Sequence, residues 1–226
     1  EPATAAEVAV IVEHGMRAML ERQEDAFYYL ALMNENQAQP SLPDGAAADV
    51  VRGMHRVRRS ETPARVRLLG SGTILHEVLA AAELLRSDWG IDTEVWSVTS
   101  YCELEREARA AQRWNRLHPD APAPSSHLQD CLAGPAPVVA ASDWLRAWPL
   151  SIAPYLQAPM SALGTDGFGR SDTRAALRRF FEVDRPHIVL AALASLAGGD
   201  PQGRRRCAEA IARYGLATEP TPPWTA

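Results

Sequence analysis

The sequence contains no lysine, because all 23 of its basic Lys/Arg positions are arginine. Within these residues, this absence excludes the lysine of a P-loop and any lysine that forms a Schiff base. Cysteine is scarce as well: Cys102, Cys131 and Cys207 are widely separated and form no Cys-x-x-Cys pair. We therefore expect neither a disulfide framework nor a zinc site, and buried or incidental thiols are the simpler interpretation.

Long apolar runs and an excess of positive charge are also missing. The longest runs, such as Val8–Val12 and Ile188–Ala194, are far shorter than the roughly 20 residues of a membrane-spanning helix, and no signal-peptide pattern opens the chain. The net charge of −5 and the pI near 5.7 give no electrostatic reason to expect a nucleic-acid partner. The composition predicts a globular cytoplasmic protein that binds neither membranes nor nucleic acid.

Asparagine is rare, and its distribution bears on the motif LGTDGFGRSDTR at residues 163–174. A Gly-Asp-Gly sequence begins the segment that holds magnesium and diphosphate in thiamine-diphosphate enzymes. That segment needs a later asparagine, but every asparagine here lies upstream, and Asp166 alone supplies too few oxygen ligands for magnesium. We interpret the motif as a backbone-shaping turn with Ser171 or Asp172 as a helix cap. Its residues are Gly164, Asp166, Gly167, Gly169, Ser171 and Asp172.

The N-terminal residues predict one helix and one strand, which cannot form a sheet by themselves. Thr4 and Glu7 have the spacing of a capping box, and apolar residues repeat at helical spacing as far as Leu20. The nearly uninterrupted apolar run Phe27–Met33 is typical of a strand buried on both faces. A Pro-rich stretch follows directly, so residues 1 to about 43 are expected to end a domain whose earlier part is absent.

Beyond a short helix at 46–54 and an arginine-rich linker, predicted strands alternate with helices. The strands are expected in RVRLLG, TEVWSVTS, APVVAAS and SALG, and the helices at 73–89, 103–116, 173–181, 185–196 and 203–214. This alternation predicts an α/β fold, a three-layer α/β/α sandwich around a mostly parallel sheet.

The glycine turn after the first of these strands is a candidate anion site. Gly70, Ser71, Gly72 and Thr73 place free backbone N–H groups at a helix start, where anions bind. Leu75 stands where a dinucleotide-binding fingerprint needs its third glycine. A plain strand-to-helix turn is the alternative, and both interpretations stay open.

Few other side chains stand out as candidates for chemistry. Glu35 follows the predicted buried strand, and strand ends of parallel sheets are where sites are built, although ordinary loop chemistry is the alternative. His118 and His127 lie in a predicted loop, and the histidines show no metal-binding spacing. No Gly-x-Ser-x-Gly elbow is present. We therefore assign no catalytic, cofactor-binding or metal-binding residue.

Five stretches carry a family resemblance, in order, over nearly the whole chain. They are FYYLALMNENQAQPSLPDGA (27–46), LLGSGTILHEVLAAAELL (68–85), VWSVTSYCELEREA (95–108), RWNRLHP (113–119) and LGTDGFGRSDTRAALRRFFEVD (163–184). Together they resemble the C-terminal part of the homodimeric pyruvate dehydrogenase decarboxylating (acetyl-transferring) component, a thiamine-diphosphate enzyme of the transketolase superfamily.

The resemblance implies an organisation and a function. Residues 1–43 would end a pyrimidine-binding domain, 44–64 would be a linker, and 65–226 would form a transketolase-type C-terminal domain. The parent oxidoreductase would decarboxylate pyruvate on thiamine diphosphate and magnesium, and reductively acetylate a lipoyl group. Segments outside this chain would hold the cofactor, so the chain alone is expected to be inactive.

Within such a parent the chain would have a structural, dimer-organising role. The implied partners are the missing N-terminal domains, a second copy of the subunit and the lipoyl acyltransferase core of the complex. A free-standing α/β anion-binding or interaction module, using the turn Gly70–Thr73, is the alternative hypothesis.

Overall fold

The computed structural model describes residues 1–225 and contains a five-stranded sheet with the order β1-β3-β2-β4-β5. The strands are β1 (Met54–Arg58), β2 (Val66–Gly70), β3 (Thr93–Val98), β4 (Val138–Ala141) and β5 (Met160–Leu163). β2 to β5 run parallel, whereas β1 pairs antiparallel with β3 at one edge. The predicted mostly parallel sheet is confirmed.

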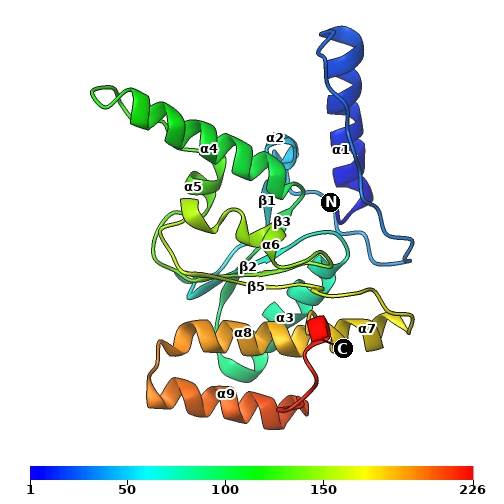
Figure 1. The fold of residues 1–226 in the computed structure, drawn as a ribbon, viewed down its shortest axis with the longest axis vertical. Helices are drawn as coiled ribbons and strands as arrows, with labels where there is room; N and C mark the ends of the chain where they lie inside the picture. Colours follow the sequence, from blue (N-terminus) through cyan, green and yellow to red (C-terminus); the bar gives the residue numbers. More distant parts are fainter. Residues whose placement is uncertain (226) are drawn as a thin grey trace.

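Helices cover both faces of this sheet, so the predicted three layers are present (Figure 1). On one face lie α3 (Ile74–Trp89) and α8 (Arg185–Ala197), with α9 (Pro201–Tyr214) packed against α8 and α7 (Arg174–Phe180) leading into it. On the other face lie α4 (Tyr101–Leu117), α5 (His127–Cys131), α6 (Ala147–Leu150) and the 3₁₀ turn Ala153–Tyr155. A further 3₁₀ turn, Pro223–Thr225, ends the described chain.

Each face of the sheet has its own apolar core because neighbouring strand residues point to opposite sides. In β2, Leu68 joins the core beneath α3 and α8, whereas Leu69 joins the core beneath α4 and α5. Both side chains are fully buried, and each such burial stabilises the fold by roughly 1.5–3 kcal/mol.

The N-terminal helix α1 (Ala5–Met16) begins with the predicted capping box. The Glu7 N–H donates to Thr4 Oγ1 at 3.2 Å, and Glu7 Oε2 accepts from the Thr4 N–H at 3.0 Å. The helix continues into a π-helical turn, Arg17–Glu21, and this end projects away from the sheet (Figure 1). The sequence signals therefore give the start of this helix correctly.

The prediction of a strand at Phe27–Met33 is wrong for this structure. Residues 26–43 run back alongside α1 as an extended segment without regular secondary structure, and we call residues 26–39 the arm. Phe27 is 90% exposed and Tyr29 81% exposed. A strand needs a neighbouring strand to accept its backbone hydrogen bonds, and residues 1–225 place none beside the arm.

The segment expected to be a linker, residues 44–64, contains regular structure. It holds the short helix α2 (Ala47–Val51), as expected, and β1, which becomes the antiparallel edge of the sheet. Met54 and His55 are buried at the start of β1. The sheet therefore begins earlier in the chain than the arginine-rich sequence indicates.

Candidate functional site

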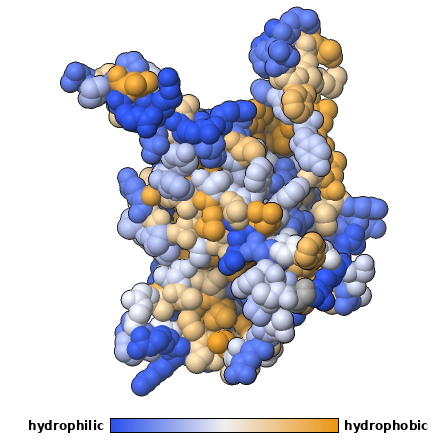
Figure 2. Space-filling model, in the orientation of Figure 1, coloured by the Kyte–Doolittle hydropathy of each residue, from blue (hydrophilic) through white to orange (hydrophobic). Residues whose placement is uncertain are grey.

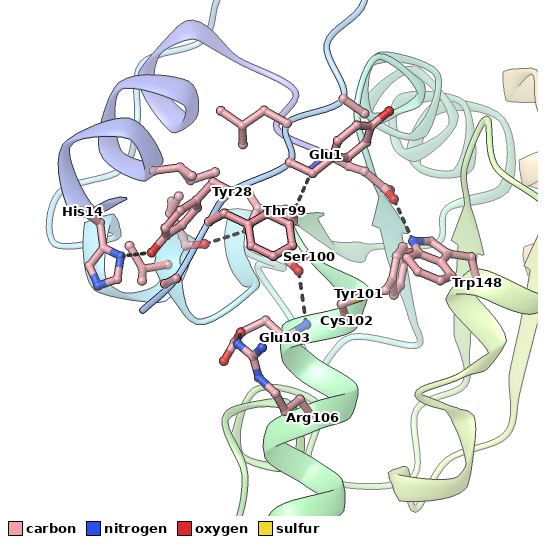
Figure 3. Close-up of a pocket in the computed structure, with 18 of the residues that line it drawn as sticks. Glu1, His14, Tyr28, Thr99, Ser100, Tyr101, Cys102, Glu103, Arg106 and Trp148 are labelled. Carbon is pink, nitrogen blue, oxygen red and sulfur yellow. Dashed lines mark hydrogen bonds and ion pairs between the residues drawn. The ribbon is translucent and has the colours of Figure 1, made fainter. Parts of the chain in front are cut away.

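A cleft of about 750 Å³ lies between the N-terminal segment and the domain built on the sheet. One wall is formed by α1 and the arm, and the other by the β3–α4 junction and α6 (Figure 3). Aromatic rings dominate the lining, which includes Phe27, Tyr28, Tyr29, Tyr101, Trp144 and Trp148. His14 and Tyr28 face each other in one wall, where the ring nitrogen Nδ1 and the phenol oxygen are 2.9 Å apart.

Two polar side chains of the cleft, Ser100 and Trp148, have structural roles. Ser100 caps α4 by accepting a hydrogen bond from the Glu103 N–H at 3.1 Å, and Trp148 Nε1 donates to Glu1 Oε1 at 2.7 Å. Tyr101 is fully buried, and that burial raises the pKa of its phenol. Apolar and aromatic side chains make up most of the lining, so the cleft favours apolar packing.

A buried polar junction fixes α1 to the sheet. Glu7 Oε1 accepts from Ser97 Oγ at 2.7 Å and lies 2.7 Å from His55 Nε2, while Glu7 Oε2 accepts from the Ala3 and Thr4 N–H groups. Burial raises the pKa of Glu7, but the hydrogen bonds from His55, Ser97 and Ala3 outweigh it, so the pKa lies below the ordinary value. One carboxylate thus joins α1, β1 and β3.

Glu35, the acid singled out in the sequence, pairs with arginines of α7. Its carboxylate is 2.7 Å from Arg178 and 3.5 Å from Arg174. Arg178 also reaches Glu77 of α3 at 3.5 Å, and Glu77 is held by Arg185 at 2.9 Å. The contacts describe an ion-pair network that ties the end of the arm to the domain, and a reactive role for Glu35 stays a prediction.

The predicted anion turn lies at the carboxyl edge of the sheet, beside the end of β4. Ser71 Oγ donates to Ser142 Oγ at 2.9 Å, and the Gly72 N–H donates to the Glu1 carbonyl at 3.0 Å. The Asp143 carboxylate is close to this turn: its Oδ1 lies 3.8 Å from the position that a Cβ on Gly72 would occupy. Burial raises the pKa of this carboxyl. Anion binding at Gly70–Thr73 stays a prediction. The Gly72 N–H already donates to Glu1, and the Asp143 carboxyl group lies beside the turn.

The motif at 163–174 forms a turn after β5, but its helix cap is not the expected one. Thr173 is the N-cap of α7, because its side chain accepts from the Ala176 N–H at 3.3 Å. Asp172 instead accepts from the Thr173 N–H at 2.6 Å. Asp166 accepts from the Arg146 N–H at 2.9 Å and pairs with the Arg146 guanidinium, which binds the turn to α6.

The two loop histidines have different surroundings. His118 stacks on Trp114 with ring centroids 4.3 Å apart, at the exposed tip of α4. His127 is buried at the start of α5, with Nε2 2.8 Å from the Met54 carbonyl oxygen and the Cys131 sulfur 3.6 Å away. Burial raises the pKa of that thiol to about 12, which is opposite to what an activated cysteine beside His127 would require.

Two general properties follow from the described residues. Residues 1–225 contain no group of three or more His, Cys, Asp or Glu side chains placed to hold a metal ion. A helix long and apolar enough to cross a membrane is likewise not found in that range.

Comparison with protein-family models assigns both parts of the chain. Residues 53–184 match the transketolase-like C-terminal domain, and residues 1–40 match the middle domain of the pyruvate dehydrogenase E1 component. The first match covers more than half of the sequence. The chain therefore belongs to the family of transketolase-like C-terminal domains.

Among curated proteins, the chain is similar to the C-terminal quarter of pyruvate dehydrogenase E1 components of the homodimeric type. It is 47% identical over 223 residues to the Pseudomonas aeruginosa protein, covering 97% of this chain and 25% of the relative. The Escherichia coli K12 protein is 40% identical over 219 residues, with 96% and 25% covered. The chain thus spans about a quarter of the length of these relatives.

Solved structures support the fold. A transketolase variant from Pichia stipitis aligns with a TM-score of 0.61 over 88% of this chain and 25% of that chain, at 16% sequence identity. At this identity the likeness shows the fold alone. It agrees with the α/β architecture of the five-stranded sheet.

Proposed function

We propose that this chain acts as the C-terminal part of a pyruvate dehydrogenase E1 subunit and has a structural role there. The observation that carries the proposal is the state of the arm. Its residues belong to the segment that matches the middle domain, yet Phe27 and Tyr29 are exposed and no strand pairs with them. In the subunit, strands of the remaining middle domain would flank the arm and bury both of its faces.

The two polar clusters would set the orientation between the middle and C-terminal domains. The Glu7 junction holds α1 against β1 and β3, and the Glu35 network holds the end of the arm against α7 and α3. Each cluster joins residues of the middle-domain match to residues of the C-terminal domain. Because the hydrogen bonds of the two clusters are directional, they favour a single docking geometry.

The parent reaction in this proposal is the decarboxylation of pyruvate, with reductive acetylation of a lipoyl group on an acyltransferase core. Thiamine diphosphate would supply the carbon chemistry, with magnesium on its diphosphate. The described residues do not fit a magnesium-diphosphate site, since they offer no cluster of three acids or histidines. We therefore assign no step of the reaction to this chain. Its proposed role is to bury one side of the middle domain.

The proposal is tested by splitting the subunit. We expect the 226-residue chain alone to give no saturable shift in melting temperature or circular dichroism when titrated with thiamine diphosphate and magnesium. Mixed with the remaining part of the same subunit, it should restore pyruvate decarboxylation. Tight, saturable cofactor binding by the isolated chain would contradict the structural role.

A matched pair of variants tests whether the arm is the part of the chain that binds the rest of the subunit. Tyr29→Ser removes an aromatic ring from the arm, whereas Leu117→Ser removes an exposed apolar side chain from the tip of α4. We expect the first variant to weaken reassembly at least tenfold and the second to leave it unchanged. Equal behaviour of the two variants would show that the arm is not the docking element.

A further inference from the structure

The cleft between the N-terminal segment and the sheet contains two buried polar atoms without a partner. Tyr101 lines the cleft and is 1% exposed, and its hydroxyl makes no hydrogen bond within residues 1–225. Glu1 Oε1 accepts from Trp148 Nε1, but Glu1 Oε2 is buried and equally unpaired in the described chain, because the nearby Ser71 hydroxyl donates to Ser142 instead. Burial and the charge of the nearby Glu1 carboxylate both raise the pKa of the Tyr101 phenol. Since buried polar atoms are normally hydrogen-bonded, both atoms favour a donor that the described residues do not supply.

A second carboxyl group, that of Asp143, lies close to Glu1. Burial raises the pKa of Glu1, and the negative charge of Asp143 adds to that rise. The positively charged amine of Glu1 acts on both carboxylates, and Arg178 acts on Asp143 while it pairs with Glu35 and Glu77. In a subunit of the proposed kind, the Glu1 nitrogen belongs to a peptide bond and carries no charge. Because an unpaired buried charge is costly, the two acids then favour a cation from outside the chain.

The walls of the cleft suit a flat cation. Aromatic rings line it from both sides, with Tyr28 on the arm and Trp148 on α6 (Figure 3). Figure 2 shows hydrophobic surface at the base of α1, beside the hollow that separates this helix from α4. The face of an aromatic ring attracts a cation. A guanidinium is planar and weakly hydrated and carries five N–H donors, so it can stack on a ring while it binds a carboxylate and a hydroxyl.

The same chain already uses this combination of groups elsewhere. Arg56 pairs with Glu94 at 2.9 Å, and its guanidinium lies 5.4 Å from the centre of the Trp96 ring. A second arginine is arranged in the same way: Arg146, with Asp166 and Trp224. Since every Lys/Arg position of the sequence is arginine, a guanidinium is the cation that these residues favour.

We propose that an arginine side chain from the remaining middle domain of the same subunit occupies this cleft. Its guanidinium pairs with Glu1, donates to the Tyr101 hydroxyl and packs against the aromatic wall. The proposal rests on the proposed function, because α1 and the arm, which form one wall, lie in the match to the middle domain, so the rest of that domain is adjacent. Arg106, the arginine among the lining residues, is held by Glu103 of its own helix.

The test uses the full-length subunit and compares Glu1→Gln with Glu24→Gln. In the first variant, the amide oxygen keeps the bond from Trp148, and the NH₂ replaces Oε2 and faces the guanidinium as another donor. Glu24 is the control, because it lines the same cleft but pairs with Arg22 in a solvated site.

The readout is the reaction of each arginine with phenylglyoxal, followed by peptide mass spectrometry. We expect one arginine upstream of Glu1 to react about tenfold faster in Glu1→Gln than in the wild type, and to react at the wild-type rate in Glu24→Gln. Unchanged reactivity of every upstream arginine in Glu1→Gln would overturn the proposal.

A second measurement keeps the proposal testable if Glu1→Gln folds poorly. A photoreactive benzoylphenylalanine in place of Trp144, which lines the wall opposite the arm, should crosslink on illumination to an arginine-containing peptide upstream of Glu1 in the same subunit. A product of twice the subunit mass, or crosslinks only to peptides without arginine, would refute the proposed occupant. Neither readout uses substrate, whereas failure of the proposed function would appear as a full-length subunit that does not decarboxylate pyruvate.

Discussion

Replacing Glu7 with glutamine tests the buried junction most directly. The carboxylate accepts from the Ala3 and Thr4 N–H groups through one oxygen, and it contacts Ser97 and His55 through the other. Glutamine has nearly the same shape, but one of its two terminal groups is an NH₂ that cannot accept. If the NH₂ replaces Oε2, it faces the Ala3 and Thr4 N–H donors; if it replaces Oε1, Ser97 Oγ and His55 Nε2 must both become acceptors, and the charge of the acceptor is lost in either case.

The magnitude follows from the loss of charge on the acceptor. A hydrogen bond to a charged group contributes about 1 kcal/mol more than one between neutral groups, so weakening the bonds of Ala3, Thr4 and Ser97 predicts that Glu7→Gln lowers the free energy of unfolding by about 3 kcal/mol. The assay is urea unfolding of the 226-residue chain, followed by circular dichroism. Glu13→Gln is the matched control, because Glu13 lies on the exposed face of α1 in a solvated pair with Arg17 and should change stability by less than about 0.5 kcal/mol.

The pH dependence provides a further check with a defined sign. The pKa of Glu7 is lowered in the folded chain, so its stabilising contribution is complete above the unfolded pKa of about 4.3 and is lost as the pH falls through the lower folded pKa. In acid the protonated wild-type carboxyl also carries a donor, so the difference from Glu7→Gln should shrink. A loss below about 1 kcal/mol at pH 7, or a difference that grows in acid, would refute the reasoning.

Three further predictions concern the ion-pair network, the turn and the arm. Arg178→Met leaves Glu35 and Glu77 without their shared cation and should lower the melting temperature by several degrees, whereas Arg174→Met, at a half-exposed 3.5 Å pair, should change it little. Gly167→Ala should cost about 1–3 kcal/mol in urea unfolding because of its positive φ and the Pro223 oxygen, while an alanine in place of Gly169, which has open space around it, should be neutral. Tyr29→Ser should reduce binding of a hydrophobic dye and self-association in light scattering without lowering the melting temperature, since the ring is exposed.

Local signals in the sequence predict much of this fold. The alternation of apolar strands with amphipathic helices gives the parallel part of the sheet, and Thr4 with Glu7 gives the start of α1. Gly90, at φ +62°, ends α3 near the predicted position. These features depend on neighbouring residues along the chain, which is why composition and spacing are sufficient to find them.

The failures arise where distant residues decide the structure. The apolar run at 27–33 has the composition of a buried strand, but strand formation needs partners that residues 1–225 do not supply. The Glu7 junction joins residues up to 90 positions apart, so no local pattern announces it. Ser97 carries only a weak signal, as a polar residue between Trp96 and Val98, and His55 carries none, because β1 contains two arginines as well. The cap of α7 was misplaced by one or two residues because Ser171, Asp172 and Thr173 are all good N-cap residues.

The N-terminal segment, formed by α1 and the arm, is closed at its base, and this has a mechanical consequence. Its two ends meet, because Gln37 Nε2 donates to the Ala3 carbonyl at 3.0 Å and the Ala5 N–H donates to Gln39 at 2.9 Å. A narrow connection of this kind between a segment and a domain would normally allow the segment to rotate relative to the domain. Here Glu7 binds one side of this connection to the sheet, and Glu35 binds the other side to α7. A force applied at the tip of α1 is therefore transmitted to the sheet and to α7 instead of bending the chain. The segment and the domain are therefore expected to move as one rigid body.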